Sequence, residues 1–214
     1  MTTLSIDSTI ALGSGKPLPV LGFGVYQVLD PRASTILALE AGYRQIDSAR
    51  VYRNEAAVGD AVAAASSVAS NKDEIYLTSK LQGKHHARAK ALAAVEDSIA
   101  TLAAVGLKWD LYLLHDATSG PIRRLEAWRV LEQKVEEGEL QAIGVSNFVS
   151  CISLFIVLAL FSHHSRVVFA TAQCAPPPRR NANIALATES YPPRRIRRRR
   201  SNETKSQSNR TAPL

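Results

Sequence analysis

Apolar and polar positions follow two different periods in the first 148 residues, and these periods alternate along the chain. Short apolar runs predict buried strands at residues 20–26, 43–46, 75–77, 109–114 and 142–145. Two stretches between them carry apolar residues at helical spacing: Leu92, Val95, Ile99 and Leu102, and then Leu125, Trp128, Leu131 and Val135. Five strands alternating with four helices through short loops predict a parallel sheet with right-handed crossovers.

Capping and turn residues place the ends of the remaining helices. Asp30 followed by Pro31 predicts the start of one helix, and Gly42 predicts its end. An alanine-rich stretch from Glu55 to about Ala65 predicts the next helix.

The N-terminal residues and the chain length complete the fold prediction. Residues 9–12 and 18–20 flank a Gly-Ser-Gly-Lys turn, so a β-hairpin is expected before the sheet. The chain has 214 residues, of which 46% are hydrophobic, and it can bury the core of one ordinary domain. An eight-stranded α/β barrel normally uses roughly 250 residues, so the chain is short for a complete one.

The net charge of +7 is unevenly distributed. Residues 149–214 hold ten Arg and one Lys against two Glu, which makes this part +9 and leaves the first 148 residues at −2. After a short apolar run, this part is rich in proline and arginine with little apolar periodicity, so we expect it to be disordered. The predicted division is a folded part at 1–148 and a basic tail at 149–214.

Other features predict a cytoplasmic protein without a membrane segment. Residues 1–13 contain no positively charged segment followed by an apolar core, so no secretory signal is expected. The apolar run at 152–161 is about half the roughly 20 residues that a membrane helix needs. Both cysteines lie in the last third of the chain, and two cysteines define no disulfide framework.

Four ionisable residues stand at or near the ends of successive predicted strands. Asp47 closes one strand and Tyr52 lies on the loop after it, while Lys80 and His115 follow the next two strands. In a parallel barrel these strand ends face one mouth, where the chemistry takes place. A Lys kept charged by an Asp favours the phenolate of a nearby Tyr, so we expect a lowered pKa and a general-acid role for Tyr52. His115 would orient a carbonyl oxygen while another group delivers hydride.

Each of these residues also has an ordinary structural interpretation. An Asp at a strand end usually caps a turn, a Lys there is usually solvated, and a half-buried His usually has a structural partner. The gathering of four such residues at matching strand ends favours the catalytic interpretation.

Five motifs in the same order resemble the aldo-keto reductases. They are Leu21-Gly22-Phe23-Gly24-Val25-Tyr26, the stretch from Gly42 to Ala49 with Tyr52 and Asn54-Glu55, Thr78-Ser79-Lys80-Leu81, Asp110 to His115, and Ile143 to Phe148. The resemblance runs in register from about residue 9 to residue 148. It implies a truncated (β/α)8 TIM-type barrel of about five strands plus the N-terminal hairpin.

The resemblance also implies an NADPH-dependent oxidoreductase that reduces a small aldehyde or ketone. By this resemblance Tyr52 would donate the proton, and Lys80 and Asp47 would adjust the acidity of Tyr52. His115 would orient the substrate carbonyl. The residues expected to border the cofactor (NADP) are Gly24, Val25, Asp47, Ser146 and Asn147. Tyr26, Tyr52 and His115 would line the substrate pocket, and no metal is expected.

The sequence departs from the family pattern at two single positions, which bear on substrate preference. A larger departure covers everything after residue 148. Val25 stands where the family often has Thr, and Gln82 where an aromatic residue is frequent. From Val149 onward nothing resembles the three further strands and the phosphate-gripping loops of the family. We therefore expect exposed barrel edges that favour self-association, and little or no turnover from this chain.

The abrupt change at residue 149 has its own hypothesis. Val149-Ser150 matches the translation of a splice-donor sequence, so the tail would come from a retained intron or a wrong gene model. Sequencing the transcript across codon 148 tests this, and a message without any alternative splice form there would contradict it.

Two alternatives place the function in the tail. One is a non-enzymatic fragment whose six arginines between 194 and 200 bind nucleic acid. We do not expect specific binding, because only Tyr191 offers an aromatic platform, and salt-dependent duplex binding lost on deleting 179–200 would decide it. The other is a metal site, whose spacing matches no common zinc pattern. Its ligands would be Cys151, His163, His164 and Cys174.

Overall fold

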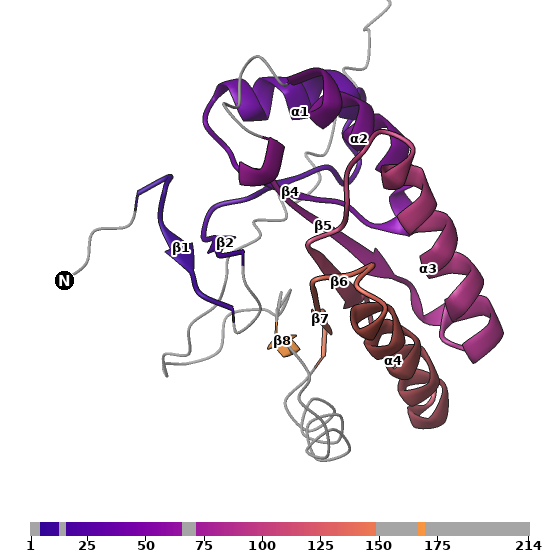
Figure 1. The fold of residues 1–214 in the computed structure, drawn as a ribbon. Helices are drawn as coiled ribbons and strands as arrows, with labels where there is room; N and C mark the ends of the chain where they lie inside the picture. The colour runs from indigo at the N-terminus through magenta and orange to yellow at the C-terminus, as the bar shows by residue number, and fades with distance from the viewer. Residues whose placement is uncertain (1–4, 13–15, 66–71, 149–166, 170–214) are drawn as a thin grey trace, which may run out of the picture.

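A parallel sheet with helices along one face forms the part of the chain that the computed structural model describes, namely residues 5–12, 16–65, 72–148 and 167–169 (Figure 1). Its strands are β3 (Phe23–Gly24), β4 (Gln45–Asp47), β5 (Tyr76–Leu81), β6 (Leu111–Leu114), β7 (Ala142–Val145) and β8 (Val167–Phe169). Each strand pairs in parallel with the next one along the chain. This order is that of a barrel wall, so the predicted α/β partial barrel is confirmed.

Helices connect these strands and cover the outer face of the sheet (Figure 1). They are α1 (Pro31–Glu40), α2 (Glu55–Ala64), α3 (Arg88–Ala103) and α4 (Pro121–Glu136), with short 3-10 helices η1 (Arg50–Tyr52), η3 (Lys72–Glu74) and η4 (Gly83–His85). The predicted hairpin is confirmed as an antiparallel pair, β1 (Thr9–Ile10) and β2 (Leu18–Pro19), which lies on the opposite side of the sheet from the helices (Figure 1).

The predicted ends of α1 are confirmed, and capping residues explain them. Asp30 accepts a hydrogen bond from the backbone N–H of Ala33 at 2.9 Å, and Pro31 occupies the first turn. Gly42 follows α1 with φ +97°, and Gly138 follows α4 with φ +75°. Residues with a Cβ rarely adopt these angles, so glycine at both positions lets the chain leave the helix.

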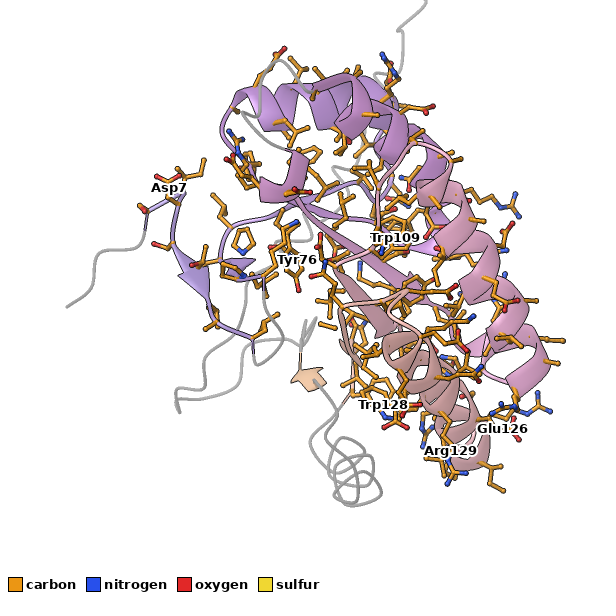
Figure 2. The ribbon with its side chains drawn as sticks, in the orientation of Figure 1. Asp7, Tyr76, Trp109, Glu126, Trp128 and Arg129 are labelled. Atoms are coloured by element: carbon orange, nitrogen blue, oxygen red, sulfur yellow. The ribbon has the colours of Figure 1, made fainter. Side chains whose placement is uncertain are left out.

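The main core lies between the sheet and the helices. Trp109 and Trp128 are almost completely buried there, and the Trp109 indole N–H donates to the backbone oxygen of Ser98 on α3 at 3.0 Å. A smaller cluster of buried residues includes Leu18 of the hairpin and Tyr76 of β5. Figure 2 labels Tyr76, which lies on the side of the sheet that faces the hairpin. Lys16 pairs with buried Asp110 at 3.2 Å. The hairpin therefore covers one end of the inner face.

Strand β5 is longer than its apolar residues predicted. The apolar run ends at Leu77, yet the strand continues to Leu81 with every residue buried. Two of its polar side chains are paired inside the fold, because Ser79 donates to Glu55 and Lys80 donates to Asp47. The buried hydroxyl of Thr78 has no hydrogen-bond partner among the described residues. Lys80 consequently lies within a strand and not after one.

Strand β8 was not predicted, and it corrects the expectation of an open edge at the fifth strand. Residues 167–169 pair with β7, so β3 and β8 are the two edges of the sheet within the described part of the chain. Self-association through an exposed barrel edge stays a prediction, and it now concerns β3 and β8.

Several predictions fall on residues outside the described ranges. They concern the apolar run at 152–161, the disorder of the Pro/Arg-rich tail, its nucleic-acid binding, and the cysteines and histidines of the alternative metal site. Among the described residues, no group of three or more His, Cys, Asp or Glu side chains is placed to hold a metal ion. No helix in the described ranges has the length and apolar character to cross a membrane.

Candidate active site

The carboxyl ends of three neighbouring strands bring the candidate catalytic residues to one place. Asp47 is the last residue of β4, Lys80 is next to last in β5, and His115 directly follows β6. Tyr52 ends η1, the short helix that follows β4. Because parallel strands present their carboxyl ends at the same edge of a sheet, these residues face one mouth.

The side chains of these four residues form two linked pairs. Lys80 donates to the Asp47 carboxylate, and also to the backbone oxygen of Ser48 at 2.9 Å. The Tyr52 hydroxyl lies 3.4 Å from Nε2 of His115. The Lys80 ammonium lies 5.3 Å from the centre of the Tyr52 ring, which joins the two pairs. The structure thus brings all four predicted residues together.

The expectation of a lowered pKa for Tyr52 was wrong. Burial raises the pKa of the Tyr52 hydroxyl above its ordinary value, and the nearby Asp47 carboxylate and Tyr26 raise it further. The Lys80 charge lies against the ring, and Asp47 compensates it. Tyr52 therefore keeps its proton at neutral pH, as a proton donor requires.

His115 is placed to act as a neutral hydrogen-bonding group. Burial lowers the pKa of its imidazole, and the positive charge of Lys80 lowers it further, while Asp116 and Asp47 oppose this. Nδ1 of His115 is buried and has no hydrogen-bond partner among the described residues. The ring stands nearly perpendicular to that of Tyr52, at 5.6 Å between centres.

We expect His115 to titrate below its ordinary pKa of 6.5, and Lys80→Met to shift that pKa upward. The unfolded chain then binds this proton more readily than the folded chain. The His115 contribution to folding stability therefore falls as the pH drops from about 6.5 through the lowered pKa. NMR titration of the ring resonances measures this, with Lys84→Gln as the control that leaves His115 unchanged. Titration of His115 at or above 6.5 would contradict the expectation.

The residues predicted to bind cofactor and substrate lie around this mouth and differ in solvent exposure. Gly24 is exposed, and a Cβ there would meet no atom within 4 Å, so space for a ligand exists beside it. Val25 is fully buried, and its backbone N–H and C=O are bonded to Asp47 and Asn54. Tyr26 is 61% exposed, and its ring lies 4.8 Å from that of Tyr52.

Asn147 and Ser146 close the other side of the mouth, directly after β7. Asn147 adopts a left-handed backbone with φ +57°, and its side-chain amide donates to the backbone oxygen of His115 at 2.9 Å. The same amide donates to the Ser146 hydroxyl at 3.2 Å. These contacts tie the end of β7 to the end of β6.

A buried polar layer behind the site was not identified as functional by sequence reasoning. The Ser48 hydroxyl donates to Asn54 at 2.7 Å, and the Asn54 amide donates to the backbone oxygen of Val25 at 2.9 Å. Glu55 accepts from Ser79 and Ser98 at 2.5 Å each. The signal available was the density of polar residues between Asp47 and Glu55, and the layer fixes the segment that carries Tyr52.

Comparison with known proteins identifies the family. The profile of the Aldo/keto reductase family matches residues 33–156, which is more than half of the chain. The chain belongs to the aldo/keto reductase family. It is similar to an aldo-keto reductase of Mycolicibacterium smegmatis, at 41% identity over 143 residues that make up 65% of this chain and 48% of the relative. Methylglyoxal reductase DkgA of Escherichia coli is 37% identical over 66% of this chain and 50% of its own length.

Solved structures of aldo/keto reductases agree with the fold. The enzyme of Brucella melitensis matches with a TM-score of 0.68 and 30% identity, over 78% of this chain and 63% of that one. An aldo-keto reductase of Bombyx mori, solved in complex with NADP, matches with a TM-score of 0.66 and 29% identity, over 78% and 59%. The chain spans about half the length of the curated relatives that it matches.

Proposed function

We propose that this aldo/keto reductase chain carries the proton-donating site of an NADPH-dependent reductase of small aldehydes or ketones. The observation that carries the proposal is the Tyr52 hydroxyl, 3.4 Å from Nε2 of His115 with the Lys80–Asp47 pair against its ring. The relative named glyoxal reductase of Bacillus subtilis, 37% identical over 147 residues, supports a carbonyl substrate.

The residues at the mouth fit the cofactor in part. The open space beside Gly24 and the exposed Asn147 are suited to a ligand, and with Asp47 and Ser146 they would hold NADPH. Val25 would contribute little, because its side chain and its backbone polar groups are already engaged. When bound, NADPH supplies the hydride.

The chain's own residues would manage the proton. A substrate carbonyl oxygen between Tyr52 and His115 would accept a hydrogen bond from each, and His115 can donate while neutral. As the oxygen gains negative charge, Tyr52 transfers its proton to it. The Lys80 ammonium then stabilises the phenolate that forms. The exposed Tyr26 ring would form one wall of the substrate site.

The activity of the chain by itself is a separate part of the proposal. The described strands form part of a barrel wall, and the relatives contain about as many residues again. Charge-assisted contacts to the cofactor phosphates are worth roughly 1.5–3 kcal/mol each, and the loops that supply them in the family are not recognisable here. We therefore expect weak NADPH binding and little turnover.

Fluorescence titration tests this expectation directly. Trp109 and Trp128 are buried in the core, and their emission overlaps the absorption of NADPH. We expect no saturable quenching at micromolar NADPH, and no oxidation of NADPH above background with a panel of aldehydes. A complete relative such as the E. coli methylglyoxal reductase serves as the positive control. Saturable quenching in the micromolar range would contradict the expectation of weak binding.

A further inference from the structure

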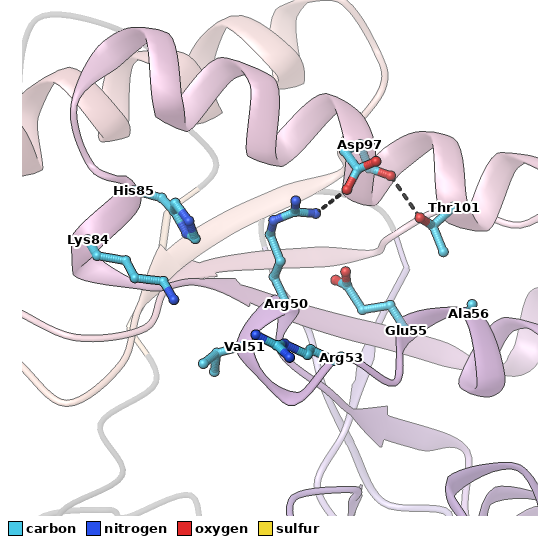
Figure 3. Close-up of a pocket in the computed structure, with 9 residues that line it drawn as sticks. All are labelled: Arg50, Val51, Arg53, Glu55, Ala56, Lys84, His85, Asp97 and Thr101. Carbon is cyan, nitrogen blue, oxygen red and sulfur yellow. Dashed lines mark hydrogen bonds and ion pairs between the residues drawn. The ribbon is translucent and has the colours of Figure 1, made fainter.

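A cavity lies outside the catalytic cluster, between η1, η4 and α3 (Figure 3). Its volume is about 570 Å³, within the range of small-ligand sites. The ionisable residues that line it are Arg50, Arg53, Glu55, Lys84, His85 and Asp97. It is separate from the active site, because Arg50 extends toward α3 whereas the hydroxyl of Tyr52 faces His115.

Basic side chains dominate this cavity and are incompletely neutralised. Arg53 and Lys84 form no ion pair with any residue in the described ranges. Arg50 pairs with Asp97 through one nitrogen at 2.5 Å. A guanidinium carries five N–H donors, so Arg50 keeps donors for a ligand. Figure 3 shows Arg50 extending toward Asp97, with Lys84 beside His85 on the other side of the cavity.

The two carboxylates of the cavity are already engaged. Asp97 is held by Arg50, and Glu55 accepts from the hydroxyls of Ser79 and Ser98 inside the fold. Burial raises the pKa of the Glu55 carboxyl, while those hydrogen bonds oppose the rise. Neither acid compensates Lys84.

His85 also lines the cavity and is partly buried there. Its Nδ1 is buried and has no hydrogen-bond partner within the described part of the chain. Burial lowers the pKa of its imidazole, and the positive charges of Lys84, Arg50 and Lys90 lower it further. The lowered pKa leaves the His85 ring uncharged at neutral pH, so the positive charge of the cavity comes from its arginines and Lys84.

We propose that this cavity binds a small oxyanion, with the phosphate group of a phosphorylated metabolite as the best match. Arg50 and Arg53 offer planar N–H forks, and Lys84 offers a point charge, which together suit the tetrahedral oxygens of phosphate.

Titration of the full chain with inorganic phosphate, followed by NMR of the backbone amides at constant ionic strength, tests the proposal. We expect saturable shifts confined to η1, η4 and the facing part of α3. Lys84→Gln should weaken binding about tenfold, because it removes one charge-assisted contact. Arg53→Asn should do the same, and Asn tolerates the left-handed backbone of Arg53, whose φ is +56°.

Arg129→Gln is the matched control, because Arg129 is an exposed arginine on α4, away from the cavity (Figure 2). It should leave phosphate binding unchanged. Shifts that never saturate, or equal weakening in all three variants, would overturn the proposal. Tighter binding of succinate than of phosphate would overturn the phosphate assignment, since it would show a carboxylate site.

Discussion

Tyr52→Phe is expected to lower carbonyl reduction by a factor of about 10²–10⁴, because it removes the general acid and leaves the ring in place. Since we expect little turnover from the chain alone, the measurement needs a complete barrel. Residues 1–148 joined to the carboxyl-terminal half of E. coli methylglyoxal reductase DkgA, to which this chain is 37% identical, would supply one. The measured quantity is kcat/KM for methylglyoxal with NADPH.

Tyr43→Phe is the matched control for this chimera. Tyr43 also carries a phenol in a partly buried ring, which packs against Phe23 at 5.9 Å between centres, away from His115. Its loss should leave kcat/KM within a few fold of the parent chimera, and NADPH affinity should be unchanged in both variants. A Tyr52→Phe chimera that keeps a tenth or more of the parental activity would show that another group donates the proton.

Lys80→Met is expected to reduce the free energy of unfolding by about 3–5 kcal/mol. The Lys80 side chain is 8% exposed and the Asp47 side chain 15%, so the substitution leaves a largely buried carboxylate without its cation. It also leaves the backbone oxygen of Ser48 without the Lys80 donor. Urea denaturation of the full chain, followed by circular dichroism, measures the loss.

Two further variants separate charge burial from lost packing. Lys108→Met alters an exposed lysine and should change stability by less than about 0.5 kcal/mol. Lys80→Met combined with Asp47→Asn removes both charges and should recover part of the loss, because no buried charge is then unpaired. A loss below about 1 kcal/mol for Lys80→Met alone would mean that water reaches Asp47 far more freely than the structure indicates.

Local pattern was enough to locate most strands and helices. The apolar run at 142–145 coincides with β7, and Asp30, Pro31 and Gly42 bound α1 as predicted. These features depend on side-chain periodicity and on the backbone preferences of single residues, both of which are local. The prediction of strand bounds failed where distant partners decide, as in β5, where Ser79 and Lys80 are buried in contact with Glu55 and Asp47.

The candidate site could be predicted from the sequence only in part. Parallel strand order alone predicts that Asp47, Lys80 and His115 share one mouth, and the structure brings them together with Tyr52. The direction of the Tyr52 pKa shift was not predictable, because it depends on how much water the fold excludes from the hydroxyl. That exclusion is a property of the packed molecule.

The sequence by itself determined the family, the alternation of strands and helices, and the residues available for chemistry at the strand ends. Only the tertiary structure decided which charged groups meet. The Lys80 ammonium lies over the ring of Tyr52, and Asp97 of α3 pairs with Arg50 of η1. Arg50 and Asp97 are 47 positions apart and meet because α3 packs across the segment that carries Tyr52. Periodicity records which face of an element is buried, but burial, pairing and charge compensation arise when those faces meet.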